Sequence, residues 1–113
     1  MEPRFRMPSL EIPALRKLAK DKPCMFRVEG VCNNDPATTV WCHSNQGKHG
    51  KGMGAKSHDP FGAFGCSSCH DWYDNKIPNV PHEEKVATFE RARDATTYFI
   101  WANNLVRVNK EAA

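Results

Sequence analysis

Two stretches of the chain place apolar residues at helical spacing. Near the amino end, residues 13–21 combine a narrow apolar stripe with basic residues, and Pro23 follows as a stop signal. Near the carboxyl end, residues 82–106 open with two glutamates, which suit a helix N-terminus. Tyr98, Ile100 and Trp101 lie partly off the apolar stripe of this second segment, so we expect a helix that is buried on two sides or covers a partner. The stripe itself is formed by Val86, Phe89, Ala92, Phe99, Ala102 and Val106.

The middle of the chain has the pattern of two strands, a loop and a short helix. Residues 25–28 and 38–43 are predicted strands, separated by a turn over 29–36 that is rich in Gly, Asn and Pro. Residues 44–65 hold six of the seven glycines with little periodicity, which predicts a long irregular loop. A helix over 68–74 follows, with Ser68 as its N-cap, and prolines at 78 and 81 interrupt it.

Composition narrows the class of protein. A chain of 113 residues with 40% hydrophobic content predicts one domain, spanning 1–113, with a single modest core. No apolar run is long enough to span a membrane, and Pro3 and Pro8 break the amino end where a signal-peptide core would lie, so we expect a cytoplasmic protein. The net charge of +3 is too mild to indicate nucleic-acid binding alone. Basic residues are nevertheless grouped, at Arg4, Arg6, Arg16, Lys17, Lys20 and Lys22 and again at Lys48, Lys51 and Lys56.

Four of the five cysteines form two pairs that indicate a metal site. Cys66 and Cys69 are two residues apart and bracket a turn, while Cys24 and Cys32 supply a second pair. In a reducing compartment, clustered cysteines bind metal more often than they form disulfides. We therefore expect structural zinc on these four, with four free buried thiols as the alternative. Cys42 is expected to face the core.

The run from Cys66 to His70 also has the spacing of the attachment motif for c-type haem. Haem is attached to this motif outside the cytosol, and no targeting segment is evident, so we reject this interpretation.

The order of these residues resembles a known family. Cys24 and Cys32, then Val40-Trp41-Cys42-His43, a loop with Asp59, and Cys66-Ser67-Ser68-Cys69-His70-Asp71 are similar to the zinc-bearing HNH, or His-Me finger, nucleases, in particular small prophage-encoded ones. The resemblance covers residues 14–75 well and the carboxyl-terminal helix more loosely. It implies an α+β fold, with a zinc-stabilised ββα core flanked by N- and C-terminal helices.

The resemblance also implies roles for individual residues. It makes His43 the general base and Asp59 an acidic catalytic residue, and it makes His70 a ligand of a catalytic Mg²⁺ or Mn²⁺ ion. Asp74 lies four residues after His70, so a regular helix would let both side chains hold that ion. The middle asparagine of the family pattern is absent from residues 60–65, which leaves open the group that orients His43.

Each of these roles has a structural alternative. His43 can be a structural residue at a strand end. His70 can instead cap the helix or join the zinc shell, Asp59 can cap a turn, and Asp74 can be a solvated helix residue.

The expected activity is metal-dependent hydrolysis of DNA phosphodiester bonds by an endonuclease. A histidine base suits this reaction because its unperturbed pKa is close to neutral pH. The alternative is a non-catalytic zinc module that binds DNA or a protein, for which neither His43 nor His70 is needed. DNA is the expected partner; a recombination protein is left open as a second one, as is the oligomeric state.

Overall fold

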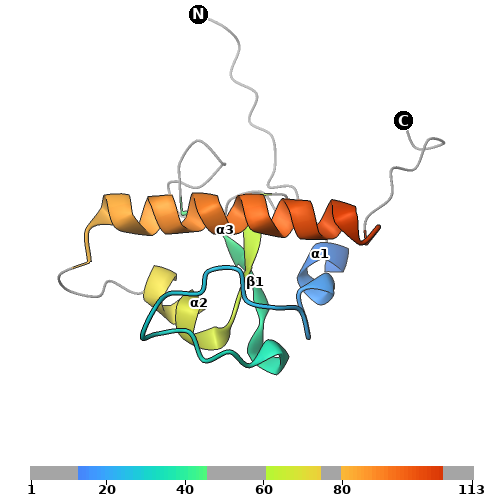
Figure 1. Ribbon diagram of the computed structural model, residues 1–113, viewed down its shortest axis with the longest axis horizontal. Helices are drawn as coiled ribbons and strands as arrows, with labels where there is room; N and C mark the ends of the chain where they lie inside the picture. The colour runs from blue at the N-terminus through green and yellow to red at the C-terminus, as the bar shows by residue number, and fades with distance from the viewer. Residues whose placement is uncertain (1–12, 46–60, 75–79, 106–113) are drawn as a thin grey trace, which may run out of the picture.

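The computed structural model describes residues 13–45, 61–74 and 80–105. In chain order it contains α1 (Pro13–Leu18), the 3₁₀ helix η1 (Pro36–Thr38), β1 (Val40–His43), β2 (Gly62–Gly65), α2 (Ser67–Asp74) and α3 (His82–Ala102). The long helix α3 extends along one side of the molecule, and the other labelled elements lie below this helix in the view of Figure 1. The fold is therefore a small mixed α+β arrangement, as the sequence predicts, with β1, β2 and α2 following one another between two helices.

The two strands form an antiparallel sheet. Trp41 is paired with Phe64, and His43 with Gly62. All four residues of β2 are buried, because α3 packs against this strand. The N–H of Phe64 donates a hydrogen bond of 3.0 Å to the buried hydroxyl of Thr96 on α3. A backbone donor on the outer edge of a short sheet is satisfied in this way without water.

The core lies between α3, the sheet and the segment before β1. Phe26, Phe64 and Phe89 are fully buried. Tyr73 of α2 stacks on Phe89 of α3 with ring centroids 5.1 Å apart, and Phe26 packs against both rings. Arg91 of α3 donates a 2.7 Å hydrogen bond to the carbonyl oxygen of Phe26. A cluster of three aromatic rings thus connects α2, α3 and the segment before β1.

The predicted strand over 25–28 is wrong, because the chain turns there instead. Only Met25 reaches the sheet, through a 2.8 Å bond from its N–H to the carbonyl of Phe64. Arg27 has a φ of 47°, which is a left-handed conformation that no strand contains. The turn brings the N–H of Arg27 to the sulfur of Cys24, so the geometry around the cysteine overrides the β-branched and aromatic pattern.

The predicted loop over 44–65 is wrong at its end, where β2 lies. The loop prediction includes Gly62 and Gly65, but these glycines are the first and last residues of strand β2. A Cβ at Gly62 would lie 2.3 Å from Nε1 of Trp41, and one at Gly65 would lie 2.7 Å from Sγ of Cys42. Glycine is needed at both positions because β1 side chains approach the backbone of β2 closely.

Helix ends also differ from the prediction. The helix expected over 13–21 ends at Leu18, and Asp21 has a φ of 65° that no helix continues through. Helix α2 begins at Ser67, so Ser68 is not its N-cap. Helix α3 ends at Ala102 instead of 106, since Asn104 is left-handed with a φ of 54°.

The buried face of α3 is shifted from the predicted stripe. Phe89 and Ala92 are buried as expected, but Thr96 and Ile100 continue the face, and Ala102 is exposed. Tyr98 and Trp101 point outward, with 76% and 54% of their surface exposed. The strand predicted over 38–43 is confirmed from Val40 onward.

Candidate metal centre and adjoining histidine site

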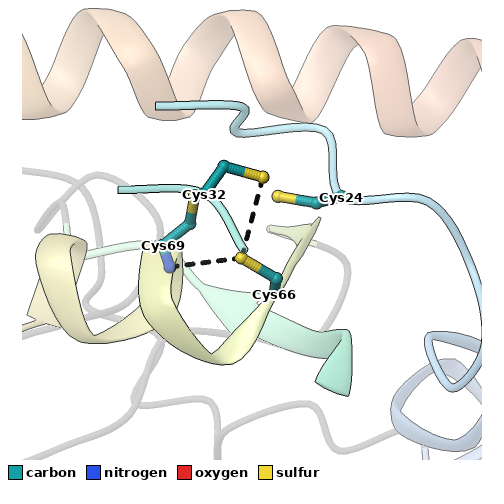
Figure 2. Close-up of side chains that lie close together, drawn as sticks. All are labelled: Cys24, Cys32, Cys66 and Cys69. Atoms are coloured by element: carbon teal, nitrogen blue, oxygen red, sulfur yellow. Dashed lines mark hydrogen bonds between the residues drawn. The ribbon is translucent and has the colours of Figure 1, made fainter. Parts of the chain in front are cut away.

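Four cysteine side chains from three segments converge on one point, as Figure 2 shows. The sulfurs of Cys24, Cys32, Cys66 and Cys69 all lie within 4.8 Å of one another. The sulfurs of Cys32 and Cys66 are 3.9 Å apart, and a tetrahedral ion with Zn–S bonds of about 2.3 Å would place them about 3.8 Å apart. All five cysteines of the chain are free thiols. The group can therefore hold a metal such as zinc, as the paired spacing predicts.

Backbone amides are directed at these sulfurs. The N–H of Arg27 reaches Cys24 Sγ at 3.5 Å, and the N–H of Cys69 reaches Cys66 Sγ at 3.4 Å; in both cases the donor is three residues after the acceptor. A third N–H, from Asn33, reaches Cys66 Sγ at 3.5 Å. Burial disfavours the Cys66 thiolate, but hydrogen bonds from the N–H groups of Asn33 and Cys69 and from neighbouring thiols outweigh it and lower the pKa of Cys66 to about 7. This residue is therefore close to the thiolate form that binds metal.

The other thiols behave differently. Burial raises the pKa of Cys32 and of Cys69, and neighbouring cysteines raise both further. Several thiolates so close together repel one another, so a cation between them removes the penalty. Cys42 lies outside this group: it is fully buried, and burial raises its pKa well above the usual range. The expectation that it fills the core is confirmed.

Helix α2 carries a second polar group immediately after the cysteines. His70 follows Cys69, and its N–H bonds to the carbonyl of Cys66 at 2.8 Å. Its Nε2 lies 2.7 Å from Oδ2 of Asp74, and both side chains are more than a third exposed. The hydrogen bond to Asp74 raises the pKa of His70, although burial opposes the shift. An ion bound by both groups, with bonds of about 2.1 Å, would separate the two atoms to about 3 Å, so little movement is required.

Asn45 connects this helix to the end of β1. Its N–H donates to Oη of Tyr73 at 2.8 Å, and its Nδ2 lies 3.4 Å from Oδ1 of Asp74. His43, half-buried at the end of β1, is only two residues earlier. The strand end that carries His43 is therefore held beside the end of α2 that carries Asp74. Asn45 was missed because it follows the strand inside the predicted loop.

The sequence-predicted residues thus fall into three groups. The four cysteines form one cluster, and His70 and Asp74 form a contact pair next to it. His43 lies at the strand end that Asn45 ties to this pair. Asp59 lies outside the described residues, as do the lysines of the glycine-rich loop. The catalytic and ion-binding roles stay predictions.

These features define a small α+β domain organised around a four-cysteine cluster. The family model described as "Putative nuclease YbcO" matches residues 13–104, and the chain belongs to this family. The resemblance is thereby confirmed at the level of this family, and the HNH assignment stays a prediction.

Two curated relatives are "Putative nuclease YbcO" of Escherichia coli (strain K12) and "Putative nuclease ybcO" of Enterobacteria phage 82. Each is 39% identical over 62 residues, which is 55% of this chain and 64% of the relative. The chain thus spans a little under two thirds of the length of these relatives.

A solved structure shares the fold. It is titled "Structure of a putative bacteriophage protein from Escherichia coli str. K-12 substr. MG1655", with a TM-score of 0.64 and 24% identity. The match covers 80% of this chain and 100% of the other.

Among the described residues, no helix has both the length and the apolar character needed to cross a membrane.

Proposed function

We propose that residues 1–113 form one nuclease domain of the HNH type that hydrolyses DNA phosphodiester bonds with the help of a divalent ion. The observation that carries the proposal is the bond network of Asn45, which holds the end of β1 beside Asp74 on α2. This link supports a site in which His43 acts together with the His70 and Asp74 pair. Membership of a family described as nuclease supports hydrolysis of a nucleic acid as the reaction.

The four cysteines serve as a scaffold in this proposal. Four thiolate ligands are typical of structural zinc, and a closed shell of four leaves no position for water or substrate. The cluster fixes the first turn of α2, since Cys66 and Cys69 are part of it or adjoin it. His70 directly follows, so zinc binding sets the place of the first side chain that can take part in chemistry.

His43 is the proposed general base, because an imidazole near neutral pH can accept a proton from the attacking water. His70 and Asp74 hold the catalytic Mg²⁺ or Mn²⁺, which suit a nitrogen and carboxylate site better than a second structural zinc. When bound, this ion stabilises the charge that develops on the phosphate and the leaving 3′ oxygen. We retain Asp59 as a further acidic residue of the site.

Cleavage of plasmid DNA in Mg²⁺ or Mn²⁺ tests the proposal. His43→Ala should lower the rate about 10²- to 10⁴-fold while zinc and DNA binding persist. His82→Ala is the matched control, since His82 is an exposed histidine at the start of α3 and should be dispensable. His70→Ala should lose affinity for the ion, so higher Mn²⁺ should partly restore its cutting but not that of His43→Ala.

The non-catalytic zinc module is the alternative outcome. It holds if the purified protein binds DNA without cutting it, or if folded His43→Ala and His70→Ala variants both cut at the parental rate. The proposal requires no recombination protein, and addition of one is therefore not part of the assay.

A further inference from the structure

A hollow beside the cysteine cluster is lined by an arginine side chain. Its volume is about 350 Å³, and it is lined by Pro23, Cys24, Arg27, Asn34 and Pro36. This volume is at the small end of the range of about 300–1,000 Å³ that is usual for ligand sites. Among the described residues of this lining, Arg27 is the only one with a charged side chain.

The guanidinium of Arg27 makes a hydrogen bond through Nε, and its Nη atoms are available for a ligand. Its Nε donates a 3.0 Å bond to the carbonyl of Cys24. Within the part of the chain that the structure describes, its two Nη atoms have no hydrogen-bond or ionic partner. A fixed, planar pair of N–H groups matches the oxygens of a phosphate better than a mobile ammonium does.

Two of the residues that line the hollow have a left-handed backbone conformation. Arg27 and Asn34 both have positive φ, at 47° and 55°. Such conformations are unfavourable for an arginine and persist only where the surroundings impose them. Here each residue lies within three positions of a clustered cysteine, Cys24 or Cys32. The N–H of Arg27 also reaches Cys24 Sγ at 3.5 Å, so the cysteine cluster helps to hold the backbone that carries the Arg27 side chain.

Charged residues of both signs lie at the edge of the hollow. The N–H of Asp21 bonds to the carbonyl of Pro36 at 3.2 Å, which brings the segment with Lys20 and Lys22 next to the lining. The neighbouring carboxylate of Asp35 accepts the N–H of Ala37 and caps η1. At the edge, Asp21 and Asp35 offset Lys20 and Lys22, so the positive charge of Arg27 in the described lining is what favours an anion.

We propose that this hollow, centred on Arg27, binds a phosphate group of the DNA strand outside the catalytic residues. The inference rests on the proposed nuclease function. A rival role for Arg27 is to offset the negative charge of four thiolates around a divalent ion, and this role predicts loss of metal instead of loss of DNA binding.

The salt dependence of DNA binding tests the inference. Arg27→Gly keeps the left-handed backbone without steric cost and removes the guanidinium. We expect roughly tenfold weaker binding of a labelled DNA duplex and a slope of log K against log salt smaller by about one. Lys17→Gln is the control, since Lys17 is an exposed basic residue of α1 that does not line the hollow. Metal content and thermal unfolding of Arg27→Gly should match the parent.

Four results overturn the inference, and each is distinct. If the parent cuts DNA but Arg27→Gly changes the slope no more than Lys17→Gln, this inference alone fails. If Arg27→Gly loses metal while its DNA slope is unchanged, the charge-offsetting role is correct. If inorganic phosphate shifts the Arg27 Nε–H signal in NMR spectra but DNA affinity does not depend on Arg27, the ligand is a free phosphate. A parent that neither binds nor cuts DNA refutes the proposed function together with this inference.

Discussion

The two candidate metal sites are built in opposite ways. The cysteine cluster draws four ligands from three segments, and three of the four are buried. The His70 and Asp74 pair comes from one turn of α2, is more than a third exposed, and is linked to the end of β1 by Asn45. A closed, buried shell suits a structural ion, whereas an open pair leaves room for water and phosphate. Under the proposed function, stability and chemistry would be divided between the two sites.

The largest expected effect is loss of the structural ion. Binding of zinc by four cysteines is coupled to folding and contributes on the order of 10 kcal/mol or more. Cys66→Ser, or a strong chelator, should therefore unfold much of the domain, as measured by elemental analysis and circular dichroism. Cys42→Ala is the control, because Cys42 is buried but lies outside the cluster and should retain the ion. Unchanged melting of Cys66→Ser would refute the structural role.

The cluster was predictable from sequence, but the rest of the site only in part. Two cysteine pairs are a strong signal because their spacing itself reflects metal geometry. The contact of His70 with Asp74 also followed from helical spacing once α2 was expected. The contacts of Asn45 were not predictable, because its hydrogen-bond partner Tyr73 is 28 residues later in the sequence. Only the folded chain brings the end of α2 next to Asn45.

The second prediction separates the two sites by their glycines. A methyl group at position 62 would collide with Trp41, opposite His43, and one at position 65 would collide with Cys42 and Phe26. Overpacking of this kind costs about 1–3 kcal/mol. Gly62→Ala should therefore impair cleavage more than metal retention, and Gly65→Ala the reverse.

Denaturant unfolding, metal content and cleavage rate would be measured for both glycine variants. Gly30→Ala is the control, because no atom lies within 4 Å of the added methyl group and only the φ of 77° is strained. Equal loss of metal in both sheet variants would show that the two sites are not separable.

The same glycines explain what the sequence could not show of the fold. The two glycines in residues 62–65 favour a loop in the sequence pattern. In the fold, the absence of a side chain at these glycines lets the side chains of β1 pack on β2. The turn at Arg27 was likewise hidden, because the residues from Met25 to Val28 have strand-like character and the left-handed backbone is imposed by the cluster. Tertiary contacts decided both cases.

A smaller effect is expected at the link between the sites. Tyr73→Phe removes the Oη that accepts the Asn45 N–H at 2.8 Å and leaves the ring contacts with Phe26 and Phe89 in place. A donor left without this partner costs about 1 kcal/mol. Cleavage should fall while bound zinc is retained. Tyr98→Phe, a change at an exposed tyrosine of α3, should alter neither property. An unchanged cleavage rate in Tyr73→Phe would mean that Asn45 does not position the site.

The smallest expected effect is the pH dependence of the His70 and Asp74 pair. The hydrogen bond to Asp74 raises the pKa of His70 in the folded protein above its unfolded value of about 6.5. The stabilisation is therefore complete below about pH 6.5 and is lost as pH rises through the folded pKa. For an exposed pair on one helix it is about 0.3–0.5 kcal/mol. Asp74→Asn should lower the titration midpoint of His70 in NMR spectra and remove this dependence. Asp71→Asn should shift the midpoint less, because Asp71 acts on His70 only through its charge. Identical midpoints in the parent and Asp74→Asn would show that the pair is not formed in solution, and the open site would then need another partner for His70.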